Sequence, residues 1–228
     1  MARETFERQL KTLLDQVLVL GSMVDQSVLD ALDALKRRDL VAARRIYETD
    51  LQINEKRYAI ESGCVTLIAT QQPMARDVRF LAAILEIITE LERIGDYAKG
   101  ICKINLLLSD EPVDPVILVE LEQMAKLGLD MLRRSLDAFV TCDVEIAREI
   151  PGEDEAVDRL YNQIYRKLVQ QMISDTTSVD RANHMMWAAH NLERMADRVT
   201  NICERIVYVA TGEIKELDTT EGNPDGLN

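Results

Sequence analysis

The sequence predicts an all-α protein organised as two tandem, pseudo-symmetric three-helix bundles with six long antiparallel helices. Hydrophobic residues make up 47% of the 228 positions but aromatic residues only 4%, and there are just 9 Gly and 5 Pro. That balance favours helices over strands and tight turns. Apolar residues also recur at steps of three and four, which is the period of an amphipathic helix. A segment E-R-x-x-D, with Ile-Cys behind it, occurs at 92–96 and again at 193–197, which indicates an internal duplication.

Three helices are predicted in the first half. Apolar residues run at helical spacing from 3 to about 37. Asp39 is a suitable N-cap for a second helix over 40–71. Gln72-Pro73 ends that helix, since the residue before proline is biased away from helical geometry. Pro73 also suits the first turn of a third helix, which is predicted to reach about residue 109.

The second half repeats this arrangement after a proline-rich join at 110–115. The first helix of this half is predicted over 116–141, and the second from Asp143 to about 173. A polar turn follows at 174–178. The last helix then reaches about 211, where Gly212 supplies the stop. Pro151-Gly152 should kink or interrupt the middle helix near its start. We therefore divide the chain into a first repeat (1–111), a second repeat (112–212) and a polar tail (213–228) that is predicted to be disordered.

Charge and cysteine usage narrow the class of function. The formal net charge is −13, which disfavours nucleic acid as a partner because phosphate binding relies on Lys and Arg. None of the four cysteines forms a C-x-x-C pair, so reduced thiols in the cytoplasm are expected. No uncharged apolar run reaches the roughly 18 residues of a membrane span, and the start carries no apolar signal region. We expect a soluble protein that reaches a membrane only through a partner.

Four pairs of oxygen-bearing side chains, spaced four residues apart, stand at matching places in the two halves. The middle helices carry Asp50 with Asn54 and Asp154 with Asp158, and the third helices carry Glu92 with Asp96 and Glu193 with Asp197. Residues four apart share one helix face, and each pair interrupts the apolar face of its helix. Carboxylates in such places need counter-charges or take up protons.

Two interpretations of these pairs are open. In the first, they form internal salt bridges or lie exposed at the bundle edge; the candidate cationic partners are Arg57, Arg93, Lys99 and Arg194. In the second, a multivalent cation is held between two helices of each bundle. Ligand sets of oxygen alone suit Mg, Mn, Ca or iron better than soft metals. His190 lies one turn before the 193/197 pair and is either a structural neighbour or a ligand.

No catalytic residue is predicted. The sequence contains no Gly-rich phosphate loop, nucleophile elbow or H-E-x-x-H motif. Neither His184 nor His190 has the Glu three residues earlier that ferritin-like di-iron sites use. The residues therefore predict a binding site rather than a catalytic site.

The motifs at 71–79 (QQPMARDVR), 91–96 (LERIGD), 192–197 (LERMAD) and 201–202 (NI) resemble those of the PhoU family, over about residues 5–212. The resemblance implies two pseudo-symmetric three-helix bundles, a homodimer, and multinuclear metal clusters of iron or zinc, with other divalent cations as further candidates. It places the first cluster at Asp50, Glu92 and Asp96, with Asn54 where an acid is expected. It places the second cluster at Asp154, Asp158, Glu193 and Asp197, and we expect this complete set to be the stronger site.

The same resemblance implies a cytoplasmic regulator, not an enzyme. It would restrain phosphate uptake and keep the phosphate-starvation response off, as an adaptor toward the phosphate ABC transporter ATPase and its sensor histidine kinase. Two alternatives stand beside it. One is a metal-free helical scaffold whose acidic pairs only form salt bridges. The other is a metal-dependent enzyme acting on a phosphorylated substrate.

Overall fold

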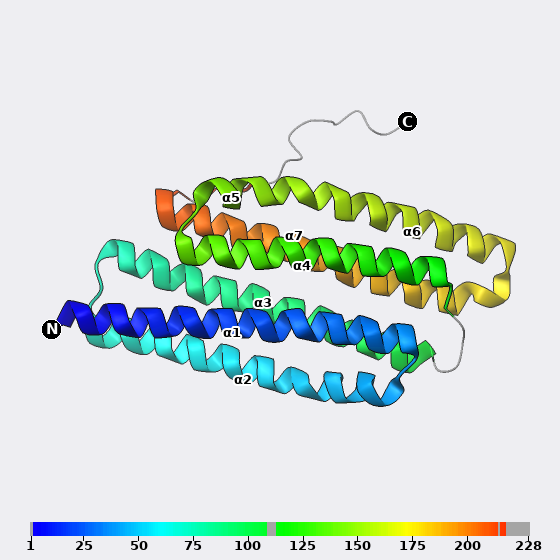
Figure 1. Cartoon of the computed structure of the whole chain (residues 1–228), viewed down its shortest axis with the longest axis horizontal. Helices are drawn as coiled ribbons and strands as arrows, with labels where there is room; N and C mark the ends of the chain where they lie inside the picture. The colour runs from blue at the N-terminus through cyan, green and yellow to red at the C-terminus, as the bar shows by residue number, and fades with distance from the viewer. Residues whose placement is uncertain (1, 109–112, 214, 218–228) are drawn as a thin grey trace.

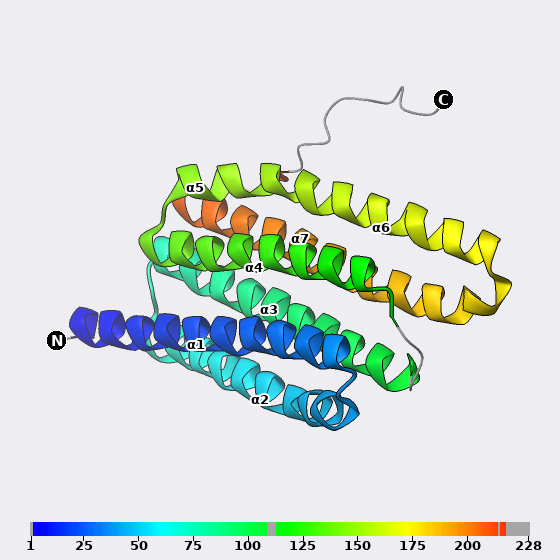
Figure 2. The same cartoon turned by 45° about the vertical axis from the view of Figure 1, so that its right-hand side comes forward.

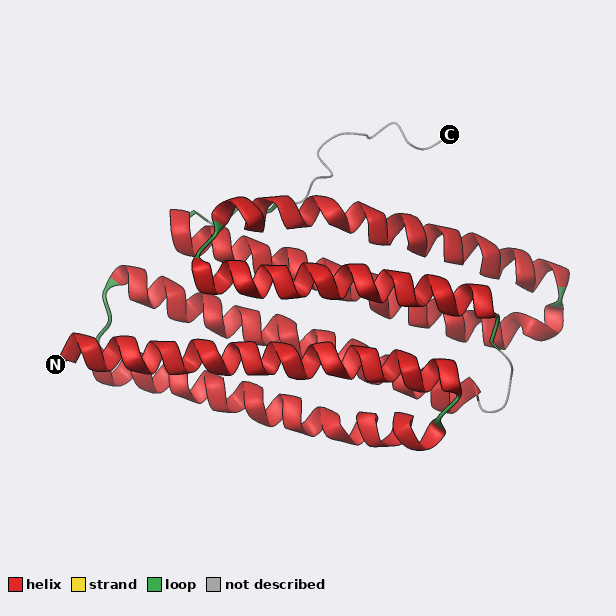
Figure 3. Cartoon of the chain, viewed as in Figure 1, coloured by secondary structure: helices red, strands yellow, loops and turns green. Residues whose placement is uncertain are grey.

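The protein is described by a computed structural model over residues 2–108, 113–213 and 215–217. The first half contains α1 (Ala2–Arg37), α2 (Leu40–Gln71) and α3 (Ala75–Leu108). The second half contains α4 (Pro115–Thr141), α5 (Val144–Glu149), the 3-10 turn η1 (Ile150–Glu153), α6 (Asp154–Ser174), the 3-10 turn η2 (Thr176–Ser178) and α7 (Val179–Thr211). The described ranges contain no strand (Figure 3). The predicted all-α fold with six long helices is confirmed.

The helices form two bundles that lie side by side with their long axes roughly aligned (Figure 1). One bundle holds α1, α2 and α3; the other holds α4, α7 and the interrupted helix made of α5 and α6. The view in Figure 2 shows the same separation after a rotation. The bundles meet through α3 and α7, which pack on one another more extensively than any other two helices, and through α1 and α4.

Helix α3 is the central element of the molecule, because it packs on α1 and α2 in its own bundle and on α7 in the other. Its apolar residues are accordingly buried on more than one face, as Leu81, Ile84, Ile87, Ile88, Leu91 and Ile94 illustrate. A single hydrophobic cluster runs through both bundles. Burying a Leu or Ile side chain contributes about 1.5–3 kcal/mol, so this shared core holds the halves together.

Local capping explains several helix ends. The Asp39 carboxylate accepts a hydrogen bond from the N–H of Ala42, and the Asp143 carboxylate accepts from Glu145 and Ile146. These side chains satisfy N–H groups that have no partner inside a first helical turn. At the other end of the chain, Gly212 ends α7 in the left-handed conformation, with φ 78°. The predicted N-cap at Asp39, the predicted helix start at Asp143 and the predicted stop at Gly212 are confirmed.

The structure moves one predicted helix start and shows the form of one predicted interruption. Helix α3 begins at Ala75 rather than at Pro73, because Gln72 is left-handed with φ 46° and the first helical bond runs from Val78 N–H to the Met74 carbonyl. The predicted interruption at Pro151-Gly152 is present, and it is a 3-10 turn that separates α5 from α6. Pro151 is buried there, and Asp154 becomes the first residue of α6.

The predicted join and tail lie partly outside the described residues. Of the join, 109–112 are not described, so the division between residues 111 and 112 stays a prediction. Of the tail, 213 and 215–217 are described: the Leu217 side chain packs against the core, and its N–H donates to Glu204 Oε1 at 3.0 Å. Within the described ranges no helix combines the length and the apolar character needed to cross a membrane.

Candidate metal centres

The first acidic site lies between α2 and α3, around the buried carboxylate of Asp50, which is 4% exposed. The Lys99 ammonium donates to Asp50 Oδ2 at 2.7 Å, and the Asn54 amide nitrogen lies 3.3 Å from the same oxygen. Among the described residues, Asp50 Oδ1 is buried and has no hydrogen-bond partner. One oxygen of this carboxylate is therefore paired with a cation and the other is unsatisfied.

Glu92 and Asp96 on α3 belong to the same site. Burial raises the pKa of both carboxyl groups, the nearby charge of Asp50 raises both further, and Asp96 also raises that of Glu92. Lys99 opposes the rise at Asp96, and Arg57 and Arg93 oppose it at Glu92. The mutual effect means that carboxylates from α2 and α3 face one shared space, and that three cations partly neutralise it.

The second acidic site lies between α6 and α7. Burial raises the pKa of Glu193 to about 7, and the charges of Asp197 and Asp158 contribute in the same direction. Burial also raises the pKa of Asp158. The His190 Nδ1 atom is 3.2 Å from Glu193 Oε2, and Arg194 Nε is 3.9 Å from Asp197 Oδ2. Carboxylates from two helices again oppose one another, with His190 and Arg194 beside them.

Asp154 joins the second site one turn before Asp158. It lines, together with Asp197, a polar cavity of about 380 Å³. The other lining residues are Arg198, Thr200, Asn201, Glu204 and Glu216. The four predicted residues thus pair across the two helices: the charge of Asp158 raises the pKa of Glu193, and Asp154 lines the same cavity as Asp197. Glu216, from the segment predicted as a tail, was not foreseen as a neighbour of this site.

The predicted salt-bridge partners divide between the two interpretations. Lys99 pairs with Asp50, as the salt-bridge interpretation expects. Arg57 instead pairs with Glu61 at 3.1 Å, and Arg93 with Glu90 at 3.0 Å. Arg194 lies 3.9 Å from Asp197 Oδ2, so the predicted internal salt bridges are present at Asp50 in the first site and at Asp197 in the second.

The donor set fits a hard cation. In the arrangement that the described residues adopt, no three His, Cys, Asp or Glu side chains stand close enough together to hold an ion. The carboxylates nevertheless influence one another's pKa from paired helices. Within the described part of the chain, Glu193 Oε2 is buried and accepts no hydrogen bond, although His190 Nδ1 lies 3.2 Å away, so a cation could use its lone pair. Oxygen-only ligands suit Mg, Mn, Ca or iron.

A polar link between the two sites was missed by the sequence reasoning. Glu90 on α3 accepts hydrogen bonds from Arg93 at 3.0 Å, from Arg198 at 3.4 Å and from Asn201 at 3.3 Å. Arg93 adjoins Glu92 of the first site, and Arg198 adjoins Asp197 of the second. In the sequence, Arg93 and Arg198 are visible only as charged residues within or beside the motifs at 92–96 and 193–197. Nothing there indicates that both side chains contact Glu90.

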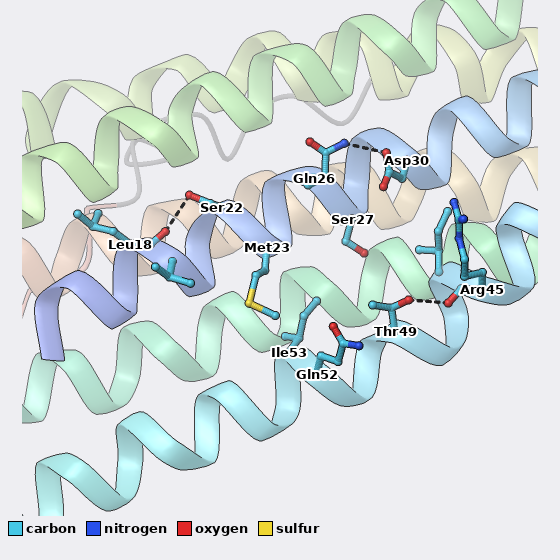
Figure 4. A pocket seen from close by; sticks show the side chains of 12 residues that line it. Leu18, Ser22, Met23, Gln26, Ser27, Asp30, Arg45, Thr49, Gln52 and Ile53 are labelled. Atoms are coloured by element: carbon cyan, nitrogen blue, oxygen red, sulfur yellow. Dashed lines mark hydrogen bonds between the residues drawn. The ribbon is translucent and has the colours of Figure 1, made fainter. Parts of the chain in front are cut away.

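A large groove lies elsewhere, between α1 and α2 (Figure 4). Its volume is about 650 Å³, and its apolar lining includes Leu18, Met23 and Ile53. Apart from Asp30 and Arg45, the lining carries no charged group. Asp50 is not part of the lining, so the groove is separate from the acidic site on the α3 side of α2. In the second bundle, the positions that match Asp30 and Thr49 are Arg134 and Glu153, which form an ion pair at 2.6 Å.

Comparisons with known proteins agree on one family. The family model described as the PhoU domain matches residues 17–104 and again 121–206. The Escherichia coli (strain K12) phosphate-specific transport system accessory protein PhoU is 37% identical over 208 residues, which cover 91% of this chain and 86% of that protein. The PhoU homolog of Clostridium acetobutylicum is 34% identical and is covered over its full length, against 96% of this chain.

Solved structures give the same result. The crystal structure of the phosphate transport system regulatory protein PhoU from Streptococcus pneumoniae superposes with a TM-score of 0.85 at 34% identity. The superposition covers 92% of this chain and 99% of the Streptococcus pneumoniae chain. The crystal structure of PhoU from Pseudomonas aeruginosa also has a TM-score of 0.85, at 33% identity. Two matched repeats, high coverage and a shared fold lead to one conclusion: the chain belongs to the PhoU family.

Proposed function

We propose that the protein is a cytoplasmic regulator of phosphate uptake and of the phosphate-starvation response. The observation that carries this proposal is similarity over nine-tenths of the chain to proteins named as accessory or regulatory components of phosphate transport. The proposed partners are the phosphate ABC transporter ATPase and its sensor histidine kinase, toward which the protein acts as an adaptor and a homodimer. The proposed role is regulatory rather than catalytic.

Metal binding is part of the proposal. Asp154, Asp158, Glu193 and Asp197 would hold a divalent cation between α6 and α7. When bound, the cation supplies positive charge that offsets the repulsion among these carboxylates. Because the donors are all oxygens, iron fits the site better than zinc, which prefers nitrogen and sulfur ligands in closed structural sites. A cation there would tie α6 to α7 and stiffen the second bundle.

Deletion of the gene tests the regulatory role. In high phosphate, the deletion strain should raise phosphate uptake and phosphatase expression, and the wild-type copy should reverse both. Cross-linking followed by affinity purification should recover the transporter ATPase or the histidine kinase. Unchanged uptake and unchanged phosphatase expression in the deletion strain would refute the regulatory proposal.

Elemental analysis tests the metal, with protein purified without chelators. We expect at least one metal ion per chain in the wild type and a clear loss in Asp197→Asn. A content below one ion per chain would favour the metal-free scaffold instead. That alternative is supported by one observation, the 2.7 Å ion pair between Lys99 and Asp50, which shows that part of the acidic charge is already balanced by the protein itself.

A further inference from the structure

The Lys99 side chain stands in the first site where a bound cation would bridge the two helices. Its ammonium lies on α3, 2.7 Å from Oδ2 of the buried Asp50 on α2. It also lies 5.1 Å from the centroid of the Tyr47 ring, a distance that allows a cation–π contact. The hydrogen bond to Asp50 raises the pKa of Lys99, and the charges of Asp50 and Asp96 act in the same direction. The ammonium therefore interacts with carboxylates from both helices.

Asn54 adds to this arrangement. Its amide nitrogen lies 3.3 Å from Asp50 Oδ2 and 3.3 Å from the Asp50 carbonyl oxygen. The amide thus directs its N–H donors, and not its carbonyl oxygen, toward the carboxylate. An N–H donor repels a cation, so Asn54 serves the Lys99–Asp50 ion pair better than it would serve a metal ion.

The second repeat provides an internal reference for these residues. With the two repeats aligned on their acidic pairs, Thr200 matches Lys99, Asp158 matches Asn54, and Tyr161 matches Arg57. The first site therefore has three carboxylates with Lys99 and Arg57 beside them. The second has four carboxylates and neutral side chains at both matching positions. The two sites use matching positions in the two repeats and differ in charge.

We propose that Lys99 is the resident cation of the first site, so that only the second site binds metal. Lys99 and Asn54 are then the residues that decide which half of the protein takes up a cation. A metal ion entering the first site must displace the ammonium from Asp50. An opposite charge in contact with a carboxylate lowers its affinity for a proton by about 10- to 1000-fold. A metal ion is also positively charged, so the first site should bind metal more weakly than the second by at least the lower of these factors. The inference rests on metal binding at the second site, as proposed above.

The test isolates the first site in the full-length chain. Glu193→Gln with Asp197→Asn removes two charges from the second site and serves as the background variant. Mn²⁺ is the probe, because it favours oxygen ligands and its unbound fraction can be counted by EPR. The wild type should bind Mn²⁺, and the background variant should bind it at least about tenfold more weakly.

The decisive variant adds Lys99→Met and Asn54→Asp to that background, which gives the first site four carboxylates and removes its ammonium while Arg57 stays in place. It should regain Mn²⁺ affinity by at least about tenfold. Two matched controls should not regain it. Lys99→Arg with Asn54→Asp keeps a cation beside Asp50, and Lys103→Met with Asn54→Asp removes an exposed ammonium one turn further along α3.

Each outcome has a distinct meaning. If the background variant binds Mn²⁺ as tightly as the wild type does, the role of Lys99 is overturned while metal binding stands. If the wild type binds no Mn²⁺, metal binding itself is overturned. Circular dichroism checks folding, and Lys99→Gln with Asn54→Asp, which keeps a hydrogen-bond donor near Asp50, replaces the methionine variant if that one does not fold. A folded variant that fails to regain Mn²⁺ also overturns the proposal.

Discussion

Glu193 should make the metal-free protein less stable as the pH rises. Its pKa is raised from the usual 4.5 to about 7 by burial and by the charges of Asp197 and Asp158. Between these two values, the folded state keeps a proton that the unfolded chain has already released. The contribution of Glu193 to stability is therefore greatest below pH 4.5, falls as the pH rises toward 7, and changes little above that.

The magnitude follows from the size of this difference. One pKa unit corresponds to about 1.4 kcal/mol, so the rise from 4.5 to about 7 amounts to about 3 kcal/mol. Because 21% of the side chain is exposed and solvent screens its charge, we expect about 2 kcal/mol. Glu193→Gln carries no charge, and in chelator at about pH 7.5 it should be more stable than the wild type by this amount. At about pH 5 the difference should shrink to below about 1 kcal/mol.

Urea unfolding followed by circular dichroism, in EDTA at both pH values, measures the difference. Glu48→Gln, an exposed position on α2, is the control and should change stability by less than about 0.5 kcal/mol. Saturating Mn²⁺ should reverse the order, since only the wild type gains binding energy in the folded state. A Glu193→Gln variant that equals the wild type at both pH values, or is less stable at the higher one, would refute the reasoning.

Three further predictions concern the fold. Lys99→Met leaves the buried Asp50 charge without its partner and should cost about 3 kcal/mol in urea unfolding at neutral pH, whereas Lys103→Met should cost less than about 0.5 kcal/mol. In the native protein, a thiol-reactive dye should label Cys142 alone, because Cys142 is exposed and burial raises the pKa of the other three thiols to about 12; these are Cys64, Cys102 and Cys203. Labelling of a second thiol under native conditions would contradict this. Asp143→Ala removes the cap of α5 and should lower stability by about 1 kcal/mol, and an unchanged thermal midpoint would show that the cap is dispensable.

Local chemistry made most of the helix pattern predictable. Asp39 and Asp143 cap the helices that follow them, and Pro151 interrupts the middle helix of the second half. Each of these effects involves only a few neighbouring residues, so it can be recognised without tertiary information. The start of α3 was misplaced because Gln72 adopts a left-handed conformation that its residue type does not demand.

The acidic sites were predictable only as residues, not as arrangements. Helical spacing placed each pair on one face, and the duplication matched the pairs between the halves. Spacing could not tell which of four cations would meet which carboxylate, since partners such as Asp50 and Lys99 are 49 positions apart. The contacts of Glu90 with Arg198 and Asn201 span 108 and 111 positions and had no local signal.

Residue type and spacing along single helices were enough to predict the all-α class, the two matched repeats, most helix ends apart from the start of α3, and the oxygen-rich character of the sites. The tertiary structure alone decided the rotation and the axial register of α2 against α3 and of α6 against α7. Those two quantities place the Lys99 ammonium on Asp50 in one bundle and leave Glu193 facing Asp158 and Asp197 in the other. The charge difference between the sites is encoded in the residues, but it acts only through side chains that packing brings together.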